Sequence, residues 1–424
     1  MSSVQKDLSS VGETRWTDRA MRRRLSRRYL AEHWFRGLGF AAVSISVLFL
    51  AFLLYSMAAK GLGGFMHYEA KLTIDFARTD LFLDPATLRG PDAARNIAGA
   101  DLEGVIAKSG TAEYGPRGAD MFSDSAVRQL ADAIVANPDM LNGSTTFWLP
   151  VSSRIDIAAK GNSDAVSERL VDMLKQRQAL KRSFNIPFFR ASDSTDPSGV
   201  GVWGALKGTF FTILVTMALA FPVGVLAAVY LEEFAPRNRW TDAIEVSINN
   251  LAAVPSIIFG LLGLAVFLNV MNLPRSAPLV GGMTLALMTM PVIVIAGRNA
   301  IKTVPPSIRD AALGIGASKM QVTFHHVLPL ALPGILTGTI IGMARALGET
   351  APLLMIGMRA FIATPPGGVT DPATVLPVQI FLWSDEVDRG FVEKTSAAII
   401  VLLLFMLLMN GLAIYLRNRF ERRW

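Results

Sequence analysis

Long runs of uncharged, apolar residues constrain this chain most. A bilayer core about 30 Å thick is crossed by a helix of about 20 apolar residues. Six runs reach that length, at about 38–59, 208–231, 246–271, 276–297, 330–354 and 395–416. Only 18% of all residues are charged, against about 25% in soluble domains. We therefore predict an all-α polytopic membrane protein with six transmembrane helices rather than a soluble enzyme.

The first run is predicted to be a retained anchor. A cleaved signal peptide has an apolar stretch of about 7–15 residues, whereas here 37 residues precede a run of 22. Residues 1–37 carry nine Lys or Arg and the last eight residues carry four. Since positive residues favour the cytoplasmic side, both termini are predicted to be cytoplasmic. We interpret these basic tails as a topology signal that contacts lipid headgroups, rather than as a nucleic-acid-binding segment.

A soluble insert is predicted between the first two runs. The 148 residues from Lys60 to Lys207 carry 17 basic and 18 acidic residues, and long loops cross the membrane largely regardless of charge. Alternating apolar residues predict a strand at 71–76, and amphipathic patterns predict helices at 123–138 and 163–178. We expect a small periplasmic α+β domain at 60–199 that ends in a linker, 192–204. Its pattern indicates docking or spacing rather than catalysis.

Several catalytic chemistries have no motif in the chain. There is no cysteine, which excludes disulfides and thiolate sites. No G-x-x-x-x-G-K-[ST] sequence occurs, so the chain is not expected to hydrolyse ATP. Adjacent His325 and His326 would point in different directions on a helix, and we predict no metal site.

The segment 298–329 is predicted to form a cytoplasmic helical hairpin. After Pro305 and Pro306, Ser307 is expected to cap a short helix, and Gly314 and Gly316 to make a bend. A second helix would then run to Pro329, where proline ends it. A compact hairpin facing the cytosol is a surface on which another protein can dock.

Arg345 and Glu349 are the charges inside the run 330–354. An Arg at the membrane centre costs about 3 kcal/mol or more, which makes a function the default hypothesis. Four residues apart on a helix, the two side chains would share a face. Either they form an ion pair that locks helices together, or Arg345 presents its charge to an anion. In the second case Glu349 would hold the Arg or accept a proton from the anion.

Prolines and small residues mark points where helices bend or pack closely. Pro222, Pro255 and Pro291 lie inside predicted crossings, where each removes a helix hydrogen bond and can kink the segment. Such prolines also occur in membrane helices without a gating role. Gly338 and Gly342 have GxxxG spacing, which allows close helix contacts.

The hairpin resembles the EAA loop of ABC importer permeases. Its pattern is Glu-Ala-Ala, three residues, Gly, nine residues, an aliphatic, one residue and Leu-Pro. The residues that fit are Ala311, Ala312, Gly316, Leu328 and Pro329. Asp310 replaces the Glu, and His326 replaces the aliphatic residue. The resemblance implies that this loop supplies a coupling helix that sits in a groove of an ATPase subunit.

The run "RALGETAPL" and its surroundings are similar to phosphate ABC transporter permeases of the PstA type, over about 200–424. The resemblance implies the fold of a type I ABC importer permease and ties Arg345 and Glu349 to phosphate passage. It also implies a bacterial inner-membrane location and four kinds of partner: a PstC-type permease, two PstB-type ATPase subunits, a PstS-type binding protein and membrane lipids. ATP and magnesium would be bound by the ATPase, not by this chain.

Two alternatives remain open. The chain could be a permease for another oxyanion or a small solute. It could instead be a membrane-anchored sensor in which the insert binds the ligand, which would explain the insert but leave the EAA-like loop and Arg345 without a purpose.

Overall fold

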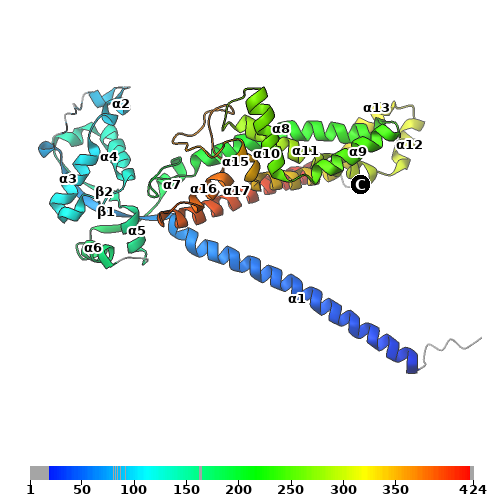
Figure 1. Ribbon diagram of the computed structural model, residues 1–424, viewed down its shortest axis with the longest axis horizontal. Coiled ribbons are helices and arrows are strands. Elements are labelled where there is room, and N and C mark those ends of the chain that lie inside the picture. The colour runs from blue at the N-terminus through cyan, green and yellow to red at the C-terminus, as the bar shows by residue number, and fades with distance from the viewer. Residues whose placement is uncertain are drawn as a thin grey trace, which may run out of the picture. The chain divides into compact units, whose positions relative to one another are not determined.

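The computed structural model describes residues 19–79, 81, 83, 85, 87–90, 92–161 and 165–420. Parts of both basic tails, 1–18 and 421–424, and the predicted helix start at Ser163 lie outside the described residues. The chain divides into two compact units, residues 1–59 and 60–424. Helix α1 (Arg19–Gly64) contains the first predicted crossing and extends well beyond it on the N-terminal side (Figure 1).

The insert is built on a three-stranded antiparallel sheet with the order β2-β1-β3. Its strands are β1 (Met66–Asp75), β2 (Ser144–Pro150) and β3 (Leu180–Phe184). Its helices are α2 (Ala93–Ala98), α3 (Leu102–Tyr114), α4 (Asp124–Ala136), α5 (Ser153–Ala159), α6 (Ala165–Gln176) and α7 (Ile186–Arg190). Short 3₁₀ turns lie at Phe76–Arg78, Thr87–Arg89, Pro116–Gly118 and Pro138–Asn142.

Alternation along β1 places one face of the strand in the core of the insert. Leu72 and Ile74 are fully buried, in the same apolar cluster as Leu130 and Ile134 of α4. Successive side chains of a strand point to opposite faces, which explains why the pattern was visible in the sequence. The prediction of a small α+β insert is confirmed.

The remaining helices form the membrane core. They are α8 (Trp203–Val229), α9 (Arg239–Ala252), α10 (Ser256–Gly263), α11 (Pro278–Lys302), α12 (Pro306–Gly314), α13 (Lys319–Gln321), α14 (Leu328–Gly348), α15 (Ala351–Met355), α16 (Leu376–Ser384) and α17 (Gly390–Phe420). Wider π turns extend α8 over Tyr230–Phe234 and α10 over Leu264–Val270, and join α13 to α14 over Val322–Val327.

Among the described residues, five helices are long and apolar enough to cross a membrane, and a sixth crossing results if one bent pair counts as a span. That pair is α9 and α10 with its extension, which meet at 99°. The prediction of a polytopic helical membrane protein with about six crossings is confirmed.

Two predicted runs are broken rather than continuous. The run 246–271 divides at Pro255, which caps α10 in a non-helical conformation. Proline also disfavours the helical region for the residue before it, and α9 ends at Ala252, ahead of Pro255. The run 330–354 divides after Gly348, where Glu349 adopts extended backbone angles. Pro222 and Pro291 do lie inside helices, α8 and α11.

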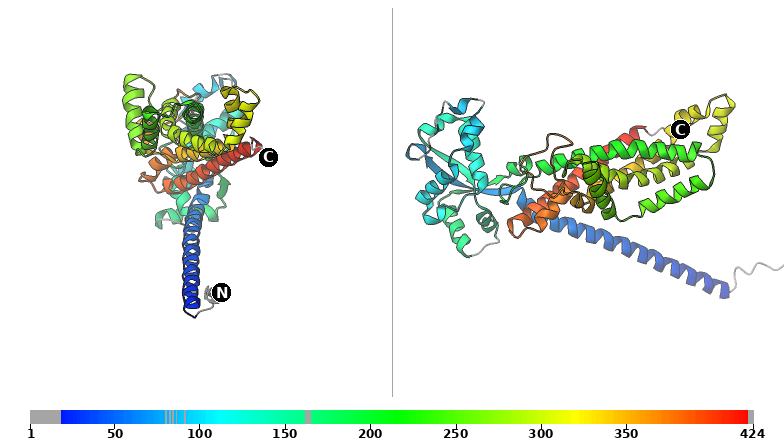
Figure 2. Two further views of the ribbon diagram at one scale, coloured as in Figure 1. Left: turned by 90° about the vertical axis from the view of Figure 1, so that its right-hand side faces the viewer. Right: turned by 45° about the horizontal axis from the view of Figure 1, so that its top comes forward.

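Helix α14 packs closely on the central helix α11, which also contacts α8 (Figure 2). Three glycines, Gly334, Gly338 and Gly342, form the contact on α14. A methyl group on Gly334 would lie 2.6 Å from Cβ of Ala300, and one on Gly342 would lie 2.9 Å from Thr289. The corresponding neighbour of Gly338 is Cβ of Ala296, closer still. Without side chains at these positions the two backbones approach directly, as in GxxxG contacts.

Replacement of the middle glycine should separate the two helices. Gly338→Leu forces a side chain into Ala296, and overpacking of this kind costs about 1–3 kcal/mol. We expect a lower melting temperature in detergent and a lower yield of folded protein. Gly411→Leu on α17 is the control, because its added side chain meets open space. Equal melting temperatures for the two variants would contradict this packing.

Candidate functional site

Helix α14 joins the two regions that the sequence singled out. The helical segment Lys319–Gly348 is 30 residues long, or about 45 Å at 1.5 Å per residue. The second helix of the hairpin, α13, is the first turn of this segment, and Arg345 lies in the last turn. Because the segment is longer than the bilayer core, about 30 Å, hairpin and Arg345 lie at opposite ends of one crossing.

The Arg345 side chain points outward from the fold of this chain. It is 45% exposed, and Ile341, one turn earlier, is 61% exposed. On the opposite face Ala346 and Leu347 are buried in the apolar core. The sequence placed Arg345 inside a crossing, whereas the structure places it near the end of one and leaves nearly half of the side chain uncovered.

Glu349 contacts Arg345 with different geometry from that predicted. The distance from Nε of Arg345 to Oε1 of Glu349 is 3.5 Å. The expected shared helix face is wrong in detail, because Glu349 is the extended residue that follows the helix. The pair therefore forms across the end of the helix, where the carbonyl groups favour a cation.

This arrangement leaves the guanidinium open to a ligand. Among the described residues, Glu349 is the one ion-pair partner of Arg345, and the contact is a long one. A guanidinium has five N–H donors in a planar fork that suits carboxylate and phosphate oxygens. Most of those donors remain available on the exposed side of α14.

The hairpin consists of α12, a tight bend and α13. Gly316 has φ +89°, a conformation that favours glycine, and Ser318 caps α13 in a reciprocal arrangement with Gln321. The expected cap Ser307 lies inside α12 instead, and Pro305 occupies the cap position. The second helix does not end at Pro329, since Pro329 lies in the first turn of α14, where a helix tolerates proline.

The motif residues of the hairpin divide between core and surface. Ala312 is buried among the ends of the membrane helices, while Asp310 and Ala311 are exposed. Leu328 and Pro329 are half-buried at the start of α14. The small side chain of Ala312 therefore lets α12 lie close to the core, while its neighbours face outward.

Ion pairs fix the hairpin to the membrane helices. Arg309 of α12 donates to Oε1 of Glu233, at 2.7 Å and 3.1 Å, and to the carbonyl oxygens of Val304 and Ile301. A neighbouring Arg298 of α11 donates to Glu245 of α9 at 2.8 Å and to Glu232 at 3.4 Å. The sequence analysis missed these residues; the signal was the acidic pair Glu232–Glu233 directly after an apolar run.

Large apolar side chains lie on the outer side of the hairpin. Leu313, Ile315 and Met320 are 50%, 84% and 59% exposed. Together with Asp310 they form what we call the hairpin surface. Clustered exposed apolar residues rimmed by polar groups are typical of protein interaction sites.

The linker between insert and core is held by a half-buried carboxylate. Asp193 accepts a hydrogen bond from the indole Nε1 of Trp383 on α16, at 3.0 Å. Burial raises the pKa of the Asp193 carboxyl, and the bond from Trp383 opposes that rise. The backbone N–H of Asp193 also donates to the carbonyl of Ile362. These contacts join the linker that precedes α8 to α16 and to the loop before it.

Comparison with known proteins places the chain in a family. Residues 220–424 match the family described as "Binding-protein-dependent transport system inner membrane component". The probable ABC transporter permease protein YqgI of Bacillus subtilis is 31% identical over 206 residues, 46% of this chain and 69% of that protein. The chain belongs to this permease family. Residues 22–169 match the family described as "Domain of unknown function (DUF3333)".

Several relatives of this permease are of the PstA type. The phosphate transport system permease protein PstA of Yersinia pestis is 31% identical over 53% of this chain and 75% of its own length. PstA 1 of Mycobacterium tuberculosis strain H37Rv is 35% identical over 37% of this chain and 50% of its own length. The predictions of a PstA-type permease and of a non-catalytic membrane subunit are confirmed.

Solved structures of ABC transporters are also similar. The methionine transporter MetNI in an inward-facing conformation matches 52% of this permease and 98% of that chain, with 18% identity and a TM-score of 0.42.

Removal of Arg309 should loosen the hairpin. Arg309→Met leaves the Glu233 carboxylate, 9% exposed, without its cation, and breaking a buried pair in this way costs about 3 kcal/mol. We expect faster amide hydrogen exchange over 306–321. The control is Arg89→Met, which breaks an exposed pair with Asp139 in the insert. Unchanged exchange in the hairpin of the Arg309 variant would contradict the anchoring role.

Proposed function

We propose that this permease is the PstA-type subunit of an ATP-driven phosphate importer. Two independent lines support the substrate: relatives named as phosphate transport permeases and a guanidinium that suits a tetrahedral oxyanion. The observation that carries the proposal is the outward-facing Arg345, with one distant carboxylate partner at 3.5 Å.

Arg345 binds the phosphate at the end of the pathway remote from the hairpin. A fixed positive charge offsets the cost of removing an anion from water, and two parallel N–H groups orient it. Glu349, 20% exposed, holds the guanidinium in position and accepts a hydrogen bond from a protonated phosphate oxygen. Since Arg345 lies on an exposed face of α14, a second permease of PstC type completes the pathway around it.

The hairpin surface couples the permease to ATP hydrolysis. A PstB-type ATPase subunit binds Asp310, Leu313, Ile315 and Met320, and ATP with magnesium is bound by that subunit. Movement of the hairpin is transmitted because Arg309 of α12 is paired with Glu233 in the extension of α8, and Arg298 in turn joins α11 to α9. A PstS-type protein delivers phosphate on the side of the membrane opposite to the hairpin. The permease lies in the bacterial inner membrane, and both of its termini face the cytoplasm.

Loss of the Arg345 charge should abolish phosphate uptake. In cells that lack the native gene, Arg345→Ala should lower the initial rate of radiolabelled phosphate uptake at least tenfold, since a charge-assisted hydrogen bond contributes about 1.5–3 kcal/mol. Arg345→Lys keeps the positive charge but not the planar fork of N–H donors. Its uptake rate should lie between those of the wild type and Arg345→Ala. Exposed Arg359 provides the control, Arg359→Ala. Unchanged phosphate transport by Arg345→Ala would remove the anion hypothesis.

The same assay separates the alternatives. Uptake of another oxyanion or of a small solute, without phosphate uptake, would identify the runner-up substrate class. The sensor hypothesis requires no transport at all, and membership of the permease family favours transport over it.

A charge on the hairpin surface should uncouple the ATPase. Ile315→Glu places a carboxylate at the most exposed apolar position of the surface, 84% exposed, and should prevent co-purification of the ATPase subunit. Val387→Glu, at a residue 97% exposed before α17, is the control and should leave co-purification intact. An ATPase that still co-purifies with Ile315→Glu at wild-type stoichiometry would show that the surface lies elsewhere.

A further inference from the structure

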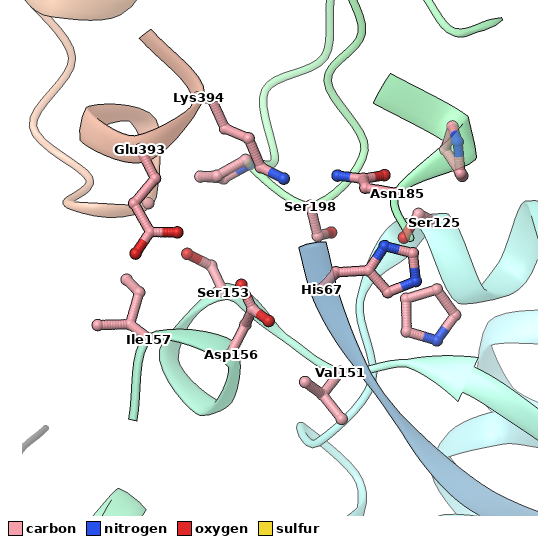
Figure 3. A pocket seen from close by; sticks show the side chains of 14 residues that line it. His67, Ser125, Val151, Ser153, Asp156, Ile157, Asn185, Ser198, Glu393 and Lys394 are labelled. Carbon is pink, nitrogen blue, oxygen red and sulfur yellow. The ribbon is translucent and has the colours of Figure 1, made fainter. Parts of the chain in front are cut away.

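A small cavity lies where the insert meets the start of α17 (Figure 3). Its polar lining includes Ser153, Asp156, Asn185, Ser198, Glu393 and Lys394. We call it the neck cavity. The cavity has a volume of about 20 Å³. A ligand therefore has to be small.

Lys394 is the unusual member of this lining. It is 4% exposed, yet among the described residues no carboxylate lies within ion-pair distance of its amine. Its Nζ donates to the carbonyl of Gly64 at a long 3.4 Å and lies over the ring of Phe188. An ammonium group has three donors, and leaving buried donors unmet costs about 1–3 kcal/mol each. The amine therefore lacks acceptors on the side of the cavity.

The carboxylates of the cavity are occupied by another lysine. Lys160 donates to Asp156 and to Glu393, each at 2.7 Å, and to the carbonyl of Gly63. The two lysines and two carboxylates sum to no net charge. Selection of a ligand therefore depends on its hydrogen bonds rather than on overall attraction.

The amine of Lys394 and the two carboxylates lie on different sides of the cavity. Figure 3 shows the amine of Lys394 beside the side chains of Asn185 and Ser198, with Glu393 and Asp156 across from them. The hydroxyl of Ser153 is buried and has no hydrogen-bond partner. A ligand that fits both sides accepts from Lys394 and donates to a carboxylate.

We infer that the neck cavity binds one protonated oxyanion, inorganic phosphate in its monobasic form. Its two unprotonated oxygens accept from Lys394 and Ser153, and one of its two hydroxyl groups donates to Glu393 or Asp156. Sulfate carries no proton at neutral pH. Its oxygens would be repelled by those carboxylates, so its binding is disfavoured. The choice of phosphate rests on the proposed function; the cavity is a separate site from Arg345.

Equilibrium dialysis with radiolabelled inorganic phosphate tests this site in the purified full-length chain in lipid nanodiscs. The chain carries Arg345→Ala, so that the pathway site is absent. We expect one bound phosphate per chain, displaced by unlabelled phosphate and at least tenfold less well by sulfate. Adding Lys394→Met should weaken phosphate binding at least tenfold, since it removes a charge-assisted bond.

A matched lysine provides the control. Lys181 also lies over an aromatic ring, Trp148, but is exposed on the insert, and Lys181→Met should leave phosphate binding unchanged. Ser153→Ala is a milder second variant and is expected to weaken phosphate binding about threefold. It tests the proposed site if Lys394→Met does not fold. No phosphate bound by the Arg345→Ala chain, or equal affinity with Lys394→Met or Ser153→Ala, would overturn the inference. Phosphate uptake by the wild-type transporter is scored separately, so either proposal can fail alone.

Discussion

The contact between α14 and α11 is the constraint on which the rest of the permease depends. Three glycines remove the side chains that would hold the helices apart, so that the helix with the hairpin at one end and Arg345 at the other lies against the centre of the core. In lipid, apolar burial gives little drive for such contacts, and close packing has to supply it. A displacement of the hairpin therefore moves a closely packed helix rather than a loose loop.

The sequence predicted the features that depend on local pattern. Charge-free length predicted the crossings, alternation predicted the buried face of β1, and the prolines and glycines between positions 305 and 316 indicated the hairpin. It failed where the outcome depends on how segments meet. Pro255 was expected to kink a crossing but instead separates two helices at 99°. The apolar residues alone do not show a change in the direction of the helix axis, so the run looked like one continuous helix.

The candidate site divides in the same way. Arg345 and Glu349 could be found because charges are rare in apolar runs, but their geometry depends on the helix end at Gly348, which the apolar run alone does not show. The pairs of Arg309 with Glu233 and of Arg298 with Glu245 join residues 53 or more positions apart, and only the folded chain brings them together. The exposure of Ile315 likewise follows from the turn at Gly316. Lys394 directly precedes the run 395–416 in the sequence, and its burial against Gly64 and Phe188 is visible only in the folded chain.

A structure of the assembled transporter with phosphate bound tests the central claim most directly. The measured quantity is the distance from the guanidinium nitrogens of Arg345 to the nearest oxygen of the anion. The account predicts about 2.7–3.2 Å, inside a pathway shared with a second permease, with the ATPase seated on the hairpin. An Arg345 that instead points to lipid headgroups, with the anion elsewhere in the pathway, would contradict it.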